Sequence, residues 1–464
     1  MGGCRRIGQV FILAMAGGCA SLASSETADP TSDAPFAGIA SASWDGEDGL
    51  TATWEGGGEG IALEVLDAGG AFVMAVEAAG GSATASRLAD GEYVLRVVSA
   101  DGQDGARSLH QWVGPDRLVS RSHAAIPGGG RTIEGSGGLV AVGGGTVDNG
   151  QVLLYDLSGG PTATPLGALS DLGEVSDVAI QGDILAVATD TTLHPEEPYG
   201  VRFYDINDPS APLQVGAIDA TADNAHTLTF GEAGIVYLAS TLNGWIAAYD
   251  VSDPAHPESL GPFRLPQPSM PHDQTWVDGR LWMAYTTGLA VADTSNPGDL
   301  QLLGVLPATW SDPFVHNLWP TADGRSLAVS EEAVGGSMRI VDIESLTEMA
   351  VLAQVETAPE HSIHNVVVRG NYAFAAWYTD GLLVFDLSEP NEPVLVGQVD
   401  TWAGSETVEN RADGSQWPNV NGATHVWPMG RHIAASDSAL GLVVFDFFPP
   451  TINWGESWGG NEGA

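Results

Sequence analysis

One pattern recurs after residue 115 and limits the fold more than any other feature: a short apolar run that ends in aspartate. The runs include "VLLYDLS", "VRFYDIN" and "LLVFDLS". Each repeat also holds three further short apolar runs, which in the sixth repeat are "HNVVV", "YAFAAW" and "VLVGQ". Four short strands in each of seven repeats are typical of a seven-bladed β-propeller. The seven aspartates are Asp156, Asp205, Asp250, Asp293, Asp342, Asp386 and Asp446.

The two ends of the repeat region indicate how the ring closes. The last repeat reaches "FDFFPP" and has no fourth strand, whereas a spare apolar run, "DRLVSRS", precedes the first repeat. Pairing this run, residues 116–122, with the last repeat would remove two exposed sheet edges. We therefore expect a propeller over 115–450, closed by the strand at 116–122, and a flexible tail over 451–464.

A second β-domain is expected before the propeller. Residues 36–114 contain short alternating runs such as "LTATW", "IALEVLDA" and "AFVMAVEA", separated by glycine-rich turns. This pattern predicts a small β-sandwich. The segment "LADGEYVLRVVSADG" resembles the penultimate strand of fibronectin type III-like domains, which implies that Tyr93 bonds back to the backbone. We predict an immunoglobulin/fibronectin type III-like sandwich that acts as a spacer or adhesion module.

The N-terminal residues have the composition of an export signal. Arg5 and Arg6 precede an apolar run over 10–16 that is too short to span a bilayer. The following "AGGC" resembles a bacterial lipobox, which implies lipid attachment at Cys19; simple cleavage is the alternative. We expect a lipoprotein-type signal peptide over 1–18 and a polar tether over 19–35. The protein would then be lipid-anchored at the outer membrane or cell surface, or in the periplasm.

Charge and cysteine usage exclude several partners. The formal net charge is −43, so we expect no nucleic acid partner and no membrane contact beyond the lipid anchor. High-salt adaptation, a GC-rich genome or acidic clusters that collect divalent cations could each explain this acidity. Both cysteines lie in the first twenty residues, which excludes a disulfide or a cysteine-type zinc site in the rest of the chain.

The sixth repeat is the most specific segment. The stretch "HNVVVRGNYAFAAWYTDGLLVFDLSEPNEPVLVG" resembles the LVIVD repeat, and the leader followed by repeats is similar to the choice-of-anchor B family of bacterial surface proteins. The resemblance covers about 119–450, although "ADTSNPGDL" and "VDIESLTEM" depart from it. It implies a seven-bladed propeller displayed outside the cytoplasm, and it implies no reaction.

Histidine recurs at the start of the first strand in five repeats. Aspartate or asparagine often follows, and the second repeat has Ser176 and Asp177 at this place. First strands start beside the central channel, so we expect these side chains to converge and to bind a ligand or a divalent transition metal such as Zn, Cu or Mn. The alternative is an architectural hydrogen bond within each repeat. The histidines are His226, His272, His316, His364 and His425, and the supporting residues are Asp177, Asp273, Asn317 and Asn365.

Two long connections are expected on the same face. The segment "DTWAGSETVENRADGSQWPNVNGA" would bring tryptophans such as Trp417 near the channel mouth. The segment "TDTTLHPEEPYG" would add His194, Glu196 and Glu197. Extended loops on one face of a rigid scaffold often mark a binding face, and tolerated insertions are the alternative.

Two functional hypotheses remain. No phosphate-binding glycine loop, G-x-S-x-G elbow or calcium loop is found, which favours a non-enzymatic, monomeric surface protein. Its histidine-bearing face would bind a protein, a glycan or a metal. The alternative is a metal-dependent lyase or oxidoreductase, with Glu196, Glu197 or Asp273 in acid or base roles.

Overall fold

The computed structural model shows an all-β chain. It describes residues 36–44, 49–56, 61–67, 71–78, 81–98, 109–113, 117–145, 149–190, 200–219, 225–232, 234–265, 270–309, 314–404, 408–410, 416–449 and 451–453. No α-helix occurs in these ranges, and the search for a helix long and apolar enough to cross a membrane found none there. The expected signal peptide, the tether and Cys19 lie outside the described residues.

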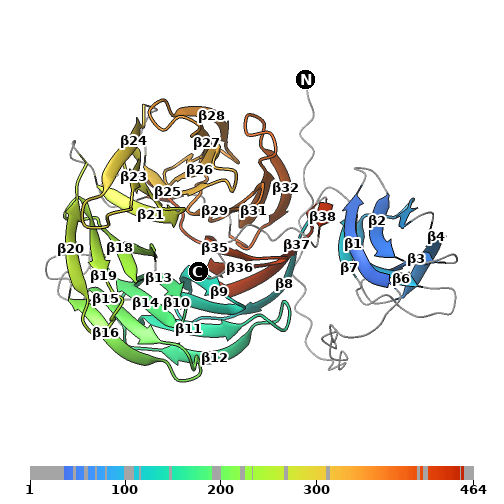
Figure 1. The fold of residues 1–464 in the computed structure, drawn as a ribbon, viewed down its shortest axis with the longest axis horizontal. Helices are drawn as coiled ribbons and strands as arrows, with labels where there is room; N and C mark the ends of the chain where they lie inside the picture. The colour runs from blue at the N-terminus through green and yellow to red at the C-terminus, as the bar shows by residue number, and fades with distance from the viewer. Residues whose placement is uncertain are drawn as a thin grey trace.

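Seven four-stranded antiparallel sheets occupy the described part of the chain between Leu118 and Phe447. Figure 1 shows them arranged around a common centre. Their first strands are β9 (Gly130–Ser136), β13 (Val175–Gln181), β17 (Thr227–Phe230), β21 (Pro271–Val277), β25 (Val315–Pro320), β29 (Val366–Arg369) and β35 (Ala423–Met429). Their second strands are β10 (Leu139–Gly144), β14 (Ile184–Thr189), β18 (Ile235–Ser240), β22 (Arg280–Tyr285), β26 (Ser326–Glu331), β30 (Tyr372–Ala376) and β36 (His432–Asp437).

The remaining two strands complete each sheet towards its outer edge. The third strands are β11 (Gln151–Asp156), β15 (Gly200–Asp205), β19 (Trp245–Asp250), β23 (Gly288–Asp293), β27 (Met338–Asp342), β31 (Leu382–Asp386) and β37 (Gly441–Phe447). The fourth strands are β12 (Thr164–Leu169), β16 (Leu213–Asp219), β20 (Glu258–Phe263), β24 (Gln301–Pro307), β28 (Ala350–Val355), β32 (Val394–Val399) and β8 (Leu118–Ala124). The chain therefore runs outward through every sheet except the last, whose fourth strand comes from before the first sheet.

The first strands contact one another in a closed circle. Each touches the first strand of the next sheet, and β35 touches β9. The circle is completed at the outer edge by β8, which pairs antiparallel with β37 from Phe447↔Leu118 to Leu442↔Ala124. The strand expected over 116–122 thus lies at Leu118–Ala124, and its pairing covers an edge of β37 that would otherwise be exposed.

Six of the seven recurrent aspartates form turns. Asp156, Asp205 and Asp250 each accept a backbone N–H from the residue two positions later, at 2.7–2.9 Å. Asp293, Asp342 and Asp386 do the same. An aspartate that bonds the backbone two residues on stabilises the turn after a strand. The residue that reveals the repeat in the sequence therefore directs the chain from the third strand to the fourth.

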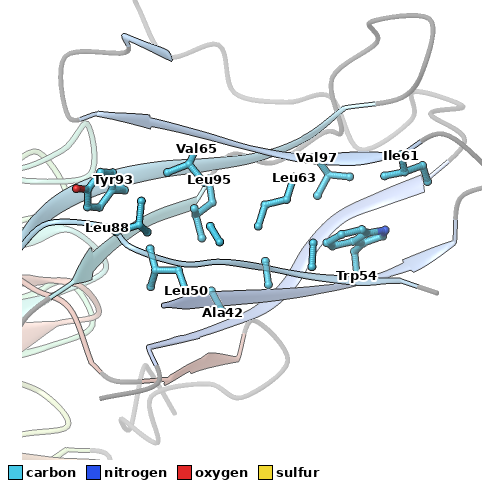
Figure 2. Packing of buried hydrophobic residues seen from close by; sticks show 13 residues of the cluster. Ala42, Leu50, Trp54, Ile61, Leu63, Val65, Leu88, Tyr93, Leu95 and Val97 are labelled. Atoms are coloured by element: carbon cyan, nitrogen blue, oxygen red, sulfur yellow. The ribbon is translucent and has the colours of Figure 1, made fainter. Parts of the chain in front are cut away.

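Two further four-stranded sheets are formed by the strands that precede the ring, with one strand added from after it. One contains β38 (Thr451–Asn453), β1 (Phe36–Trp44), β2 (Leu50–Gly56) and β5 (Ser82–Ala85), and the other contains β4 (Phe72–Glu77), β3 (Ala62–Asp67), β6 (Gly91–Val98) and β7 (Leu109–Val113). Figure 2 shows their shared core, in which Leu50 and Trp54 of one sheet face Leu63 and Leu95 of the other. Tyr93 Oη donates to the Ala89 carbonyl at 2.9 Å, the bond that the fibronectin-like resemblance implies.

The C-terminal segment differs in part from expectation. Residues 451–464 were predicted to be a flexible tail, yet Thr451–Asn453 form β38 and pair antiparallel with Ser41–Ser43 of β1. The alternating Thr-Ile-Asn sequence is too short to signal a strand by itself, and its partner lies about 400 residues away in the sequence. Residues 454–464 are outside the described part.

Candidate functional site

All five recurrent histidines line one cavity of about 400 Å³ at the start of the first strands. Three of them, His272, His316 and His425, lie within β21, β25 and β35, while His226 and His364 lie just before β17 and β29. Three of the predicted supporting residues line it as well: Asp177, Asp273 and Asn365. Asn317 is buried beside them, and His194, Glu196 and Glu197 are outside the described residues.

Strand register divides the cavity side chains into two rows. In β21 the pairing with β22 shifts between Pro271 and Asp273, so His272 is the extra residue of a bulge. His316 has the same place in β25, between Val315 and Asn317. Because a bulge re-aims its side chain, these histidines form an upper row at the strand start.

His425 belongs to the other row. The sequence alignment placed it with the other histidines, but in β35 the register shift falls between Ala423 and His425, so Thr424 occupies the bulge. His425 instead pairs with Ser436, just as Asn317 pairs with Ser330. His425 therefore lies one position further along its strand than His272 and His316 do along theirs. The sequence alone did not show that the bulge falls at Thr424.

The lower row joins neighbouring sheets. The Leu228 N–H donates to Asp177 Oδ2 at 2.9 Å, and the Val366 N–H donates to Asn317 Oδ1 at 2.9 Å. Asn317 Nδ2 also donates to Asp273 Oδ2 at 2.9 Å. Each of these bonds joins the first strands of two adjacent sheets. The predicted supporting residues therefore hold the inner strands in place around the cavity.

Four imidazoles near the starts of the first strands form an arc. Ring centroids are 4.5 Å apart between His226 and His272, 4.0 Å between His272 and His316, and 4.1 Å between His316 and His364. At the far end, the His364 ring lies 5.0 Å from the Tyr378 ring. Side chains from four adjacent sheets are thus in direct contact, which a bond confined to each repeat would not produce.

The two ends of the arc have hydrogen-bond partners. His226 Nδ1 lies 2.5 Å from Asp190 Oδ2. His364 Nδ1 donates to the Thr424 carbonyl at 2.6 Å, and because a carbonyl only accepts, this bond fixes the proton on Nδ1. In the middle of the arc, Nδ1 of His272 and Nδ1 of His316 are buried and have no partner. The unpartnered nitrogens therefore belong to the two central histidines.

Burial keeps most of these histidines neutral. It lowers the pKa of His272 and His316 well below the ordinary value, and neighbouring histidines add to the effect. Burial also lowers the pKa of His364 to about 3 and that of His425 to about 4. His226 differs: burial opposes its charged form, but the bond to Asp190 and the nearby carboxylates raise its pKa. Near pH 7 the central imidazoles offer lone pairs.

A carboxylate that the sequence analysis did not select completes the centre. Glu332 Oε2 is 3.6 Å from His316 Nε2, and Tyr378 Oη donates to Glu332 Oε1 at 2.6 Å. Glu332 follows β26, whose end pairs with the start of β25 through Val315↔Glu331. Because β25 and β26 form an antiparallel pair, their register places Glu332 beside His316. The sequence indicates this pair of strands, so the position of Glu332 could have been inferred from it.

Aromatic rings and one ion pair form other parts of the wall. Phe314 lies 5.2 Å from His272 and 5.9 Å from Trp417, between ring centroids. Trp417 is in β34 (Gln416–Pro418), which pairs with β33 (Val408–Asn410) within the long connection expected near the channel mouth. On another side, Arg131 forms an ion pair with Glu174. The cavity wall thus combines polar and charged side chains with apolar and aromatic ones.

A family model and solved structures are similar to parts of this chain. The family model of the LVIVD repeat matches residues 362–401. The β-propeller domain of Cps50 (Swd1) from Myceliophteria thermophila is similar in structure, at 13% identity and a TM-score of 0.52, over 71% of this chain and 98% of that one. BamB from Moraxella catarrhalis aligns at 14% identity and a TM-score of 0.45, over 72% and 92% of the two chains. The search of curated proteins found no match.

These findings define the class of protein. The chain is an all-β protein with a repeat β-propeller, and one of its repeats matches the LVIVD model. This propeller carries a histidine-lined cavity at the start of its first strands.

Proposed function

We propose that this protein is an exported, lipid-anchored LVIVD-type propeller that binds a ligand in its histidine-lined cavity. The observation that carries the proposal is the convergence of five histidines on one cavity of about 400 Å³. Ligand pockets of about 300–1,000 Å³ are common in proteins. The proposal includes a closed ring of seven blades, an immunoglobulin/fibronectin type III-like spacer sandwich, and membership of the choice-of-anchor B family.

The side chains that line the cavity favour a neutral or cationic polar ligand. Its carboxylates, which include Asp190 and Glu174, outnumber its single arginine, Arg131. Neutral imidazoles can both donate and accept hydrogen bonds, and Trp417 provides a ring face beside them. A sugar at the end of a glycan has this combination of hydroxyl groups and apolar ring faces. The second hypothesis, a metal-dependent lyase or oxidoreductase, depends on the metal site argued below.

A cavity-filling variant tests ligand binding. Ser176 lines the cavity, and S176W would fill the space with an indole ring. The probes are mono- and disaccharides, observed by ligand NMR with the full chain in mild detergent. We expect at least one sugar to bind to the wild type and to lose its signal with S176W. S259W, on the exposed side of β20, is the matched control and should retain binding. Absence of binding by every sugar, or equal binding by S176W, would contradict the glycan proposal.

Cysteine replacement tests the anchor. If Cys19 carries the lipid, C19S should move the protein from the membrane fraction to the soluble extracytoplasmic fraction and abolish its labelling by a radioactive fatty acid. C4S is the control, because Cys4 lies within the expected signal peptide. Membrane retention and labelling that persist in C19S would show that this cysteine is not the anchor.

A further inference from the structure

We propose that His272, His316 and Glu332 form a zinc site in the wall of the cavity. One ligand atom from each residue lies within 4.8 Å of the others, and all three residues are buried. Among the described residues, this is the group of three that meets the spacing for a shared ion. The inference rests on the proposed function, because the ion would be part of the surface that binds the ligand.

The first supporting observation is the spacing of the ligand atoms. His316 Nε2 and Glu332 Oε2 are 3.6 Å apart. Two ligands of a tetrahedral zinc ion, each at about 2.0–2.1 Å, are separated by roughly 3.3–3.4 Å. This pair therefore needs little adjustment, and the His272 ligand atom, which lies within 4.8 Å of the other two, would move inward to complete the set.

The second observation concerns buried nitrogens without partners. His272 is 7% exposed and His316 is 3% exposed, yet neither Nδ1 has a hydrogen-bond partner. A buried polar atom without a partner costs about 1–3 kcal/mol, so such atoms are rare in folded proteins. The His316 nitrogen that faces Glu332 is Nε2, so an ion there would leave the proton on Nδ1; with no partner at Nδ1, neither ring has a bond there that would hold it away from an ion.

The third observation is the support around Glu332. Tyr378 Oη donates to Glu332 Oε1 at 2.6 Å and leaves Oε2 directed at His316. Groups that hold a ligating carboxylate in this way commonly increase the affinity for the metal. Tyr378 is itself buried and contacts His364 through its ring. Neighbouring sheets therefore keep the carboxylate oriented before an ion arrives.

The donor set selects the metal and leaves a position for an exchangeable group. Two imidazoles and one carboxylate suit zinc better than calcium or magnesium, which prefer oxygen alone. Three protein ligands are typical of zinc sites that keep the fourth position for water or a ligand. His272 and His316 line the cavity, so the fourth position would be reached from it, where a ligand hydroxyl could coordinate the ion.

The test measures metal binding directly. The full chain, purified in mild detergent and stripped with a chelator, is titrated with zinc ion by calorimetry and with cobalt ion by visible absorption. We expect one zinc ion per chain and the intense cobalt bands of a four- or five-coordinate site. E332Q and H316Q should weaken zinc binding by about tenfold or more. Y378F, which retains all three ligands, should weaken it by less and preserve the cobalt spectrum.

Two controls separate ligation from general damage. E174Q changes a cavity carboxylate outside the group, and H256Q changes an exposed histidine, so both should bind zinc within about twofold of the wild type. Thermal unfolding of the zinc-free variants checks that E332Q and H316Q are folded; if either is not, Y378F and the wild-type cobalt spectrum decide.

Different results would contradict the zinc site and the proposed ligand binding. The zinc site is wrong if the stripped wild type takes up no zinc, or if E332Q and H316Q both bind it as the wild type does. If sugar binding still depends on Ser176 in that case, the proposed function stands without the metal. If both assays are negative, the cavity has neither role.

Discussion

At the scale of single residues, the same side chain has different roles around one cavity. His226 is paired with Asp190, His364 is held by a backbone carbonyl, and His272 and His316 have unpartnered nitrogens. Recurrence in the sequence was enough to predict that these histidines converge. It was not enough to predict their partners, because Asp190 and Thr424 come from sheets other than those of His226 and His364.

A prediction at this scale concerns Asp446, the last of the repeat aspartates. Burial disfavours its charge, but the hydrogen bond from His432 and the charges of Arg431, His432 and Arg121 outweigh burial, so its pKa is lowered. A lowered folded-state pKa stabilises the protein above the unfolded pKa, near 3.9, and the effect is lost as the pH falls through the folded value. D446N should therefore reduce the free energy of unfolding by about 2 kcal/mol at pH 7.

The pH dependence and a matched control make this prediction specific. Chemical unfolding of wild type and D446N should show that their difference in free energy shrinks towards pH 3. D299N, which changes an exposed aspartate after the fourth repeat's third strand, should have little effect at either pH. A difference between wild type and D446N that is constant with pH would contradict the assignment.

At the scale of strands, the sequence predicted where the strands recur, but it did not predict the bulges within them. Alternating apolar runs and the closing aspartates were enough to place the third and fourth strands. The bulges at His272 and His316, and the displaced one at Thr424, add a residue without altering composition, so the alignment of histidines was one position off at His425. The strand β38 was also missed, since its three residues depend on a distant partner.

The closing strand β8 provides a prediction at this scale. Leu118 is 3% exposed and packs into a core shared by β8 and the sheets of β31 and β37. L118A should reduce the free energy of unfolding by about 2–5 kcal/mol, because it leaves a cavity where the last sheet is completed. L213A, at a 66% exposed leucine on the outer strand β16, should change it by less than about 0.5 kcal/mol. Equal effects of the two variants in chemical unfolding would show that β8 does not stabilise the ring.

At the scale of the whole molecule, the ring and the N-terminal sheets are joined at the closing strand. Arg121 of β8 donates to Asp446 Oδ2 at 2.8 Å and to Glu92 Oε2 of β6 at 2.6 Å, and β38 follows the ring to pair with β1. Figure 1 shows the N-terminal sheets beside the sheet that contains β8 and β37. The sequence did not predict this junction, because it depends on a strand pairing across about 400 residues and on an ion pair that no pattern marks.

The junction makes a prediction about coupled unfolding. E92Q removes the charge that Arg121 pairs with across the two parts, so calorimetry should show their unfolding transitions moving apart relative to the wild type. E64Q removes an ion pair with Arg96 inside the N-terminal sheets, and it should lower their transition without changing the coupling. Transitions that separate equally in both variants would show that Arg121 does not link the parts.

The account depends most on the claim that the histidines of adjacent sheets create one binding centre. A crystal of the full chain soaked in zinc, with anomalous diffraction recorded on both sides of the zinc edge, tests this most directly. The account predicts one strong anomalous peak in the cavity, about 2.0–2.2 Å from His272, His316 and Glu332. A zinc-soaked crystal with no peak there, or with peaks only at surface carboxylates, would contradict it.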